Sequence, residues 1–242
     1  MLTVATAGWA IPRSCAEAFP ESGSSLQRYA TRLAGVEINS SFHRPHRRST
    51  YERWAGSVPE AFRFSVKLPK SISHERKLQD CAEPLARFLD EVGGLGEKLA
   101  ILLLQLPPKL AFDAAAAESF LRQLSATIPT RIACEPRHPS WFEASADNLL
   151  RDLKVARVAA DPAVVERAAV PGGWPGLVYH RMHGFPAIYR SSYNDGRLEE
   201  MRSQIFDRAP DAPSTWYVFD NTASGAATQD ALVLIESLEL PE

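Results

Sequence analysis

The sequence predicts an α/β fold, specifically a single (β/α)8 TIM-like barrel that spans residues 1–242. Eight short apolar runs alternate with segments of helical periodicity, and eight strand–helix units in 242 residues match the size of such a barrel. No internal repeat, low-complexity tract or shift in composition marks a linker between domains. The strands are expected at Thr3–Ala7, Gly35–Ser41, Phe62–Leu68, Leu99–Leu106, Arg131–Glu135, Val155–Ala160, Leu177–His183 and Thr215–Asp220.

Helices between these strands are predicted by residues that cap helix ends. Ser and Asp side chains accept hydrogen bonds from the free N–H groups of the first turn, and a Glu three residues later completes a capping box. Ser49 and Glu52 show this pattern ahead of a short helix that ends near Trp54. Asp80 and Glu83 resemble a second capping box, ahead of a helix that ends at Gly93-Gly94, and Asp113 can cap a helix over Ala114–Thr127. Two further helices are expected to start from Ser24 and near Ser145. The last two are expected at Arg197–Phe206 and Thr228–Leu238.

One connection lacks a helical pattern. The segment from Asp161 to Gly176 contains three prolines and three glycines, which interrupt both helices and strands. We therefore expect a loop or a single turn there, so that the barrel is irregular around its sixth crossover. A doubly wound open sheet remains the alternative architecture.

Charge and hydropathy exclude several classes of partner. The chain has 27 Lys and Arg against 29 Asp and Glu, a net charge of −2, so no broad basic surface is available for nucleic acid. Its most hydrophobic stretch, Leu99–Leu106, is far shorter than the ~20 apolar residues that span a bilayer. No secretion signal precedes the polar segment from Arg13, and Cys15, Cys81 and Cys134 form no paired motif. These features predict a cytoplasmic protein without membrane attachment.

Polar side chains share one parity in four of the predicted strands. Because side chains alternate faces along a strand, residues two apart lie on the same face. A parallel sheet covered on both faces should instead be continuously apolar, as Leu99–Leu106 is. In a barrel these polar sets would point into the interior near the carboxyl ends of the strands, where barrel active sites lie. They are Glu37, Asn39 and Ser41, then Ser65 and Lys67, then Glu135 and Arg137, and finally Tyr179, Arg181 and His183.

Seven short motifs are distributed from the first predicted strand to the last. They are Gly8-Trp9, Val36–Phe42, Phe64–Lys67 with Ile72–His74, Gln105–Pro108, Glu135–Trp141, Tyr179–Gly184, and Asn221-Thr222 followed by Gly225. Together these motifs resemble the YecE-like family of barrels, catalogued as domain of unknown function number 72. The resemblance implies a TIM-like barrel and no established activity. The sequence departs from the family pattern at His43 and Asp220, where Tyr and Asn are usual.

Clustered cations at the predicted barrel mouth point to a bound anion. Lys67, Arg137 and Arg181 lie on the inward parity, with Arg44 at the rim, and guanidinium groups pair bidentately with phosphate or carboxylate. The alternative is that these cations only neutralise buried carboxylates such as Glu37. The other residues expected to contact substrate are Asn39, Trp141, Tyr189, Asn221 and Thr222, together with Glu37 itself.

Five residues are candidates for proton transfer or nucleophilic chemistry. Histidine titrates near neutrality, and a neighbouring carboxylate can fix its tautomer or tune its pKa. Glu135, His74, His138 and His183 fit this description. Lys67 could form an imine with a carbonyl substrate if its neighbours lowered its pKa, although an ion-paired lysine is commoner at such positions.

The function predicted most directly is an enzyme, a hydrolase, lyase or isomerase, that acts on a small anionic metabolite of phosphorylated or sugar-like type. No nucleotide-binding glycine loop is present, and the cofactor is left open. No motif spacing indicates a metal site, although a divalent ion could be held by some of Glu37, His74, Glu135, Asp161, His183 and Asp220. Two alternatives remain open, a metal-dependent barrel that processes nucleic acid and a binding module without turnover. A polar barrel interior without any chemistry is also compatible with the strand parity. The sequence does not indicate an oligomeric state.

Overall fold

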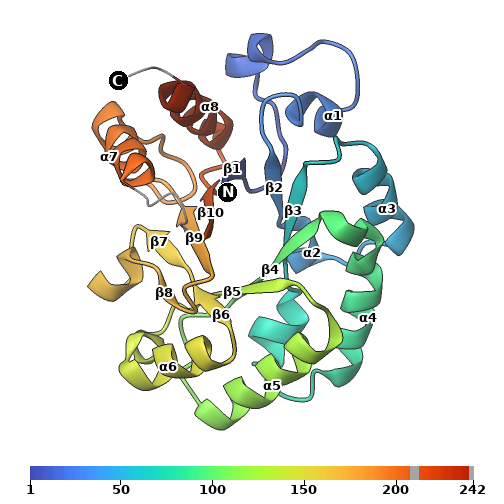
Figure 1. The fold of residues 1–242 in the computed structure, drawn as a ribbon, viewed down its shortest axis with the longest axis vertical. Helices are drawn as coiled ribbons and strands as arrows, with labels where there is room; N and C mark the ends of the chain where they lie inside the picture. Colours follow the sequence, from blue (N-terminus) through green and yellow to red (C-terminus); the bar gives the residue numbers. More distant parts are fainter. Residues whose placement is uncertain (208–212, 240–242) are drawn as a thin grey trace.

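The computed structural model of the protein describes residues 1–207 and 213–239, and strands alternate with helices through most of this chain (Figure 1). The strands are two to seven residues long. They are β1 Leu2–Thr6, β2 Gly35–Ile38, β3 Arg63–Lys67, β4 Leu99–Gln105, β5 Arg131–Glu135, β6 Val155–Arg157, β7 Ala159–Asp161, β8 Gly172–Gly173, β9 Leu177–Met182 and β10 Ser214–Phe219.

The strands pair into two sheets, one in the order β1-β10-β9-β7 and the other in the order β2-β3-β4-β5-β6-β8. All pairings are parallel except that between β6 and β8. Strands β2 to β6 follow chain order in one sheet, while β1 lies beside β10 in the other. Neither sheet shows the reversal of strand order that a doubly wound sheet requires. The predicted parallel α/β fold is confirmed, whereas the hydrogen bonds of the described strands do not form one closed ring.

The two sheets approach each other at two places along the chain. After β1, Ala7 makes a parallel bridge with Glu37, and Gly8 N donates to Glu37 O at 2.8 Å. The predicted sixth strand, Val155–Ala160, divides at Val158 into β6, which pairs with β5, and β7, which pairs with β9. One extended segment therefore belongs first to one sheet and then to the other.

Two hydrophobic clusters occupy opposite faces of the strands. On β4, Ile101 and Leu103 belong to one cluster while Leu102 and Leu104 belong to the other, as the alternation of side chains requires. The larger cluster includes the apolar stripes of helices that lie outside the strands (Figure 1). The smaller cluster draws on both sheets, so their inner faces pack against each other. Its members are Ala5, Ile101, Leu103, Ala133, Ala156, Val158, Leu177, Tyr179, Trp216 and Val218.

The predicted helices are present, although their starts depend on different residues in two cases. Ser24 forms a capping box with Gln27, and the Asp113 carboxylate accepts from Ala116 N at 3.0 Å, as expected. The predicted caps at Ser49 and Asp80 are wrong, because the helices begin at Arg48 and after Cys81 without a side-chain cap. The α-helices are α1 Ser25–Tyr29, α2 Ser40–His43, α3 Arg48–Gly56, α4 Ala82–Val92, α5 Ala114–Thr127, α6 Ala144–Asp152, α7 Asp195–Phe206 and α8 Ala226–Glu239.

Single helical turns fill several connections that the sequence left as loops. The α2 turn shortens the predicted strand Gly35–Ser41, so that Asn39 and Ser41 follow β2 rather than belong to it. The expected irregularity between Asp161 and Gly176 is confirmed, because a single 3-10 turn and the two residues of β8 are its only regular elements between β7 and β9. The 3-10 helices are Arg13–Ala18, Gly93–Lys98, Pro139–Phe142 and Glu166–Ala169, and a π-helix covers Ser71–Glu75.

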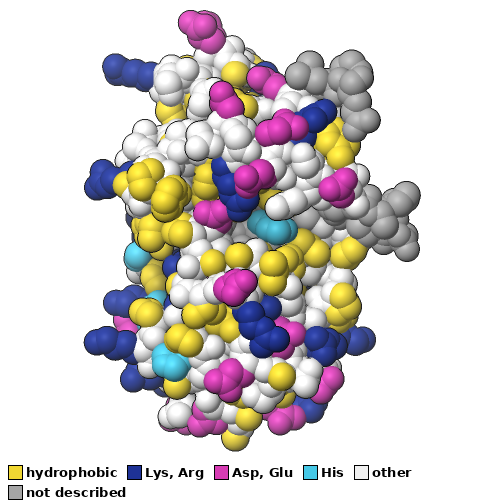
Figure 2. All heavy atoms as spheres, turned by 90° about the vertical axis from the view of Figure 1, so that its left-hand side faces the viewer, with side chains coloured by type: hydrophobic (Ala, Val, Ile, Leu, Met, Phe, Trp, Pro, Cys, Tyr) yellow, Lys and Arg dark blue, Asp and Glu magenta, His cyan; other side chains and the backbone are white. Residues whose placement is uncertain are grey.

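The surface agrees with the balanced composition. On the face shown in Figure 2, basic and acidic side chains are interspersed and neither sign forms a broad area. Within residues 1–207 and 213–239, no helix is long and apolar enough to cross a membrane. Cys15, Cys81 and Cys134 are all buried as free thiols.

Candidate functional site

Arg181 on β9 is the centre of a buried ionic cluster that joins the two sheets. Its Nε and Nη2 donate to the two carboxylate oxygens of Glu37 on β2 at 3.0 and 2.7 Å. Its Nη1 donates to Glu135 on β5 at 2.6 Å, and Nη2 also donates to Asp220 after β10 at 2.8 Å. The Arg181 side chain is fully buried, so three carboxylates replace the water that a guanidinium otherwise requires.

His183 lies between two of these carboxylates. Its Nε2 is 2.9 Å from Glu135 Oε1 and its Nδ1 is 3.1 Å from Asp220 Oδ2. Arg137 Nη2 donates to Glu135 Oε1 at 2.6 Å and lies 3.0 Å from His183 Nε2. Residues from β5, β9 and β10 are thereby held in one network just beyond the carboxyl ends of these strands.

The cations of this cluster lower the pKa values of two of its carboxylates, Glu135 and Asp220. Burial alone would raise the pKa of Glu135, but Arg181, Arg137 and His183 together hold it well below the usual range. The pKa of Asp220 is likewise lowered, because Arg181 and the hydrogen bond from His183 outweigh its burial. The same carboxylates raise the pKa of Arg181 further above its already high value.

A cavity of about 630 Å³ opens directly above this cluster. Residues that follow β2, β3, β4, β5, β9 and β10 contribute to its wall, so it lies at the carboxyl ends of strands from both sheets. Its basic side chains are Lys67, Lys70 and Arg137, against one carboxylate, Asp220. The lining residues are Asn39, Phe42, His43, Lys67, Lys70, His74, Gln105, Leu106, Pro108, Arg137, Val164, Tyr189 and Asp220.

Lys67, the last residue of β3, is the buried cation of this wall. Its side chain is buried, and Nζ lies 4.3 Å from the centroid of the Phe42 ring. Among residues 1–207 and 213–239, the ammonium has no carboxylate within 4.0 Å and no hydrogen-bond partner. Burial, followed by the charge of Arg181, lowers the pKa of Lys67 from 10.5 to about 8.

His74 lies on the same wall, in the π-helix Ser71–Glu75. Its ring packs edge to face on Phe42 at a centroid distance of 4.9 Å. The Ser73 hydroxyl donates to Pro69 O at 3.2 Å, so it accepts from His74 Nδ1 at 3.0 Å. This assigns the proton of the neutral ring to Nδ1 and leaves a lone pair on Nε2. Burial, Lys67 and Lys70 lower the pKa of His74, which keeps the ring neutral at pH 7.

Asn39 and Tyr189 complete the predicted residues that line the cavity. Asn39 Nδ2 donates to Asp220 Oδ1 at 3.3 Å, while its buried Oδ1 has no partner among the described residues. Tyr189 is partly exposed and packs edge to face on His183 at 5.4 Å between ring centroids. Both side chains therefore connect the cavity to the cluster beneath it.

Four predicted site residues lie behind the cavity wall, and two of them are arginine-bound carboxylates. Glu37 and Arg181 are fully buried and satisfy each other. Glu135 and His183 are 1% exposed and bind one another. These four side chains hold Arg137 and Asp220 in place and do not line the cavity.

Four other predicted residues do not line the cavity, and three of them hold the framework in place. His138 caps the 3-10 helix Pro139–Phe142 by accepting from Ser140 N at 3.2 Å, and Trp141 donates to Leu110 O at 3.0 Å from within the core. Asn221 Nδ2 donates to Asp230 at 2.6 Å and to Ser191 O at 2.8 Å, which fixes the loop after β9. Thr222 is exposed in the turn after β10 and is absent from the cavity wall.

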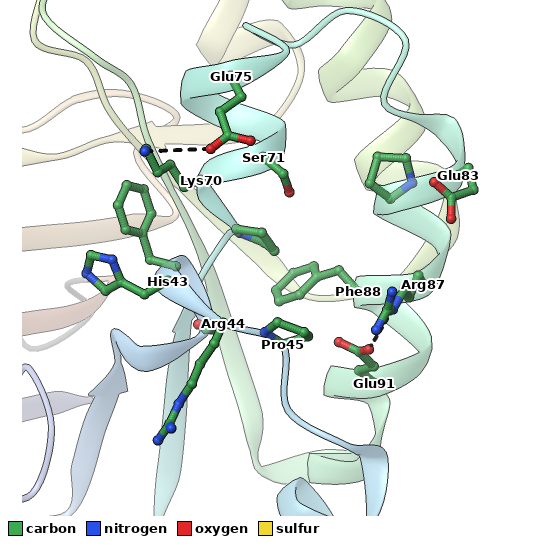
Figure 3. Close-up of a pocket in the computed structure, with 14 residues that line it drawn as sticks. His43, Arg44, Pro45, Lys70, Ser71, Glu75, Glu83, Arg87, Phe88 and Glu91 are labelled. Atoms are coloured by element: carbon green, nitrogen blue, oxygen red, sulfur yellow. Dashed lines mark hydrogen bonds and ion pairs between the residues drawn. The ribbon is translucent and has the colours of Figure 1, made fainter.

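Arg44 lines a second cleft of about 470 Å³ beside the cavity, which shares Phe42, His43 and Lys70 with it. Figure 3 shows the Arg44 side chain directed away from the other labelled residues of this cleft. Lys70 pairs with Glu75 at 3.6 Å and Arg87 with Glu91 at 3.0 Å on its sides, so these charges are compensated locally. The second cleft extends the cavity towards α4 and adds no unpaired buried cation.

Two residues of the site, Asp220 and Phe42, lie outside the predicted catalytic and substrate-binding residues, and Asp220 was considered only as a possible metal ligand. Asp220 follows Trp216 and Val218 on the inward parity of the last strand, so the same rule that found Arg181 could have assigned it to the site. Phe42 could not be found in this way, because β2 ends at Ile38 and Phe42 lies on α2. The turn of this helix, absent from the sequence prediction, brings Phe42 under Lys67.

The arrangement offers cations for an anion, a neutral imidazole for proton transfer and a lysine of lowered pKa. In the part of the chain that the structure describes, no three His, Cys, Asp or Glu side chains are grouped to hold a metal ion. The carboxylates that such a group would need are already bound by Arg181.

The chain is similar to curated proteins of unassigned function. It is 28% identical to the protein YecE of Escherichia coli K12 over 151 residues, which are 60% of this chain and 55% of YecE. The chain thus spans about half the length of that relative in the match. It is 22% identical to YunF of Bacillus subtilis, with 99% of this chain and 95% of YunF covered.

Solved structures support the fold. A DUF72 family protein of Enterococcus faecalis matches with a TM-score of 0.81 at 21% identity, covering 100% of this chain and 97% of its own. The corresponding protein of Thermotoga maritima matches with a TM-score of 0.78 at 23% identity, covering 99% and 100%. A fusion protein with a xylose isomerase-like TIM barrel reaches a TM-score of 0.50 at 14% identity, covering 98% of this chain and 42% of that one. These identities show the fold alone.

The sequence matches the model of the family described as "Protein of unknown function DUF72" over residues 3–242, and the chain belongs to this family.

Proposed function

We propose that this protein is an enzyme that binds a small anionic molecule in the cavity beside Lys67 and moves a proton there. In this proposal the two sheets are the two halves of one TIM-like barrel, and the cavity is its mouth. The smaller hydrophobic cluster, which draws on both sheets, supports that interpretation. The observation that carries the proposal is the unpaired ammonium of Lys67 in a buried wall.

An anion would supply the partner that Lys67 lacks. A buried charge is costly unless it is paired, and every carboxylate of the neighbouring cluster is already bound by Arg181, Arg137 or His183. Arg137 lies in the same wall, and only its Nη2 makes hydrogen bonds with described residues. A phosphate or carboxylate between Lys67 and Arg137 would therefore meet two cations with unused donors.

His74 is the proposed proton carrier. Its Nε2 lone pair is available because Nδ1 holds the proton and donates it to Ser73. A neutral histidine in a wall with two cations can accept a proton from a bound molecule and return it. Glu135 and His183 are positioning residues in this proposal, since they hold Arg137 and Asp220 in place and do not line the cavity.

The anion site can be tested with inorganic phosphate. Its effect on the melting temperature should be measured at constant ionic strength, with chloride as the reference anion. We expect phosphate to raise the melting temperature of the native protein and to have little effect on K67M and R137Q. The matched control is K154M, because Lys154 is exposed and precedes β6 at the opposite end of the strands. Equal stabilisation of all four proteins would disprove the site.

Turnover separates an enzyme from a binding module. The protein should be incubated with a mixture of small phosphorylated and carboxylic metabolites, and their loss followed by mass spectrometry. We expect depletion of at least one anionic compound by the native protein and none by H74Q, which lacks the basic nitrogen. Phosphate binding without any depletion would support a binding module instead.

A further inference from the structure

We infer that Lys67 is a nucleophile that forms an imine with its substrate, and that this substrate is a small carbonyl compound bearing an acidic group. The inference rests on the proposed function, because it uses the same cavity, and it adds the reacting bond. The inference is based on the position of the Lys67 amine at the end of β3, in a cavity wall that also contains Arg137 and His74.

The cluster beneath the cavity explains why Lys67 is not an ion-paired lysine. Both oxygens of Glu37 accept from Arg181, and Oε2 also accepts from the Tyr179 hydroxyl at 2.8 Å. The oxygens of Glu135 are bound by Arg181 and Arg137. Because the guanidinium groups occupy these carboxylates, the lysine is left with the face of the Phe42 ring.

Asp220 is the remaining carboxylate of the cluster, and it too is occupied. Its Oδ2 accepts from Arg181 at 2.8 Å and lies 3.1 Å from His183 Nδ1, and its Oδ1 accepts from Asn39. Lys67 therefore interacts electrostatically with Asp220 without a direct contact. An amine without a carboxylate partner is free to lose its proton and to approach an electrophile.

This environment makes the free amine available at neutral pH. With a pKa of about 8, roughly a tenth of Lys67 is unprotonated at pH 7, against roughly one part in three thousand for a lysine of ordinary pKa. The physical causes are burial and the nearby charge of Arg181. Lysines desolvated beside another cation are the ones that enzymes use as nucleophiles.

The reaction balances without an external reagent. The Lys67 amine attacks the carbonyl carbon, a C–N bond forms, and one amine proton moves to the former carbonyl oxygen to give a carbinolamine. The C–O bond then breaks, the second amine proton leaves with the oxygen, and the products are the imine and one water. His74 can carry these protons, since its ring and the lysine pack on the same Phe42 ring and its Nδ1 is held by Ser73.

The acidic group of the substrate would pair with Arg137. This guanidinium is fixed by Glu135 and His183 through Nη2, and it contributes to the cavity wall. The apolar side chains of Phe42, Val164 and Tyr189 in that wall suit a short carbon chain. The chemical class is therefore a small oxo acid or a carbonyl compound that carries a phosphate.

The test is to trap the imine by reduction. The native protein is incubated separately with pyruvate, 2-oxoglutarate and dihydroxyacetone phosphate in the presence of cyanoborohydride, and modified lysines are mapped by peptide mass spectrometry. A reduced imine adds the mass of the probe acid minus one oxygen atom. We expect labelling of Lys67 by at least one probe to exceed that of exposed Lys154 by at least about ten-fold, given their different unprotonated fractions. R137Q should lower this labelling and K154M should leave it unchanged.

The outcomes separate this inference from the proposed function. If phosphate stabilises the protein as described above but no probe labels Lys67 above Lys154, the imine is disproved and the anion site stands. If neither effect is seen, both fail. K67R, which keeps the positive charge but cannot form the imine, should still be stabilised by phosphate and should lose the label at residue 67. Persistence of that label on the peptide in K67R would overturn the assignment.

Discussion

Arg181 on β9 donates to both carboxylate oxygens of Glu37 on β2, from Nε at 3.0 Å and from Nη2 at 2.7 Å, and so fastens one sheet to the other. The pair is fully buried on both sides. Arg181 also reaches Glu135 and Asp220, so a single guanidinium spans strands of both sheets. Its position explains why an arginine predicted to hold substrate is part of the framework instead.

R181K should destabilise the protein strongly. A lysine carries its three donors on one nitrogen and cannot reproduce the four hydrogen bonds that the planar guanidinium makes, so buried carboxylates would lose partners. We expect the free energy of unfolding to fall by about 3–5 kcal/mol, as for a broken buried ion pair. Urea unfolding measures this change. As a control, R122K on the exposed face of α5 should change it by less than about 0.5 kcal/mol.

E135Q should weaken the pH dependence of the free energy of unfolding in the acidic range. The pKa of Glu135 is lowered on folding, so its stabilisation is present above 4.5, the unfolded value, and is lost as the pH falls through the folded value. The glutamine variant lacks this titration. Its free energy of unfolding should therefore be lower than that of the native protein at pH 7 and should fall less steeply below pH 4.5. Parallel curves for the two proteins would contradict the assignment.

K67M should stabilise the protein at neutral pH. Because the pKa of Lys67 falls from 10.5 to about 8 on folding, the unfolded chain binds more protons between these values, and native stability rises as the pH increases from 8 to 10.5. Methionine keeps the apolar stem and removes the buried charge. We expect a gain of up to about 3 kcal/mol at pH 7, which shrinks towards pH 10.5. Thermal or urea unfolding over this range measures it, and a loss of stability at pH 7 would refute the unpaired charge.

Y179F should cost stability where Y189F does not. The buried Tyr179 hydroxyl donates to Glu37 at 2.8 Å and lies 2.9 Å from Ser65 Oγ, between the two sheets. Its removal leaves a buried carboxylate with one partner fewer, for which we expect a loss of about 1–3 kcal/mol. Tyr189 is partly exposed, so Y189F should change the free energy of unfolding by less than about 0.5 kcal/mol. Similar losses in both variants would argue against the interior network.

Strand parity predicted much of the fold and of the ionic cluster. The alternation that separates Ile101 from Leu102 is a local property of the chain, and it placed Glu37, Glu135, Arg181 and the other inward residues on one face without knowledge of their partners. Strand parity could not predict which of the cations would form ion pairs with the buried carboxylates. That depends on the position of β9 opposite β2, which is a relation between distant segments.

The remaining differences arise where the chain leaves its strands. His138 was expected to be catalytic because it follows a strand, but its ring caps a helix turn that the sequence pattern did not reveal. Phe42 and His74 depend on two single helical turns after β2 and β3. Such short turns carry little propensity of their own and are fixed by the packing around them.

The most direct test of the account is the pKa of Lys67 itself, measured by NMR titration of its side-chain nitrogen with K67M to assign the signal. We predict a value of about 8 in the free protein, and a rise when phosphate is added, because a bound anion favours the charged amine. Lys154 should titrate as an ordinary exposed lysine in both samples. A Lys67 pKa near 10.5 that phosphate does not change would contradict the unpaired cation on which the proposed anion site and imine both depend.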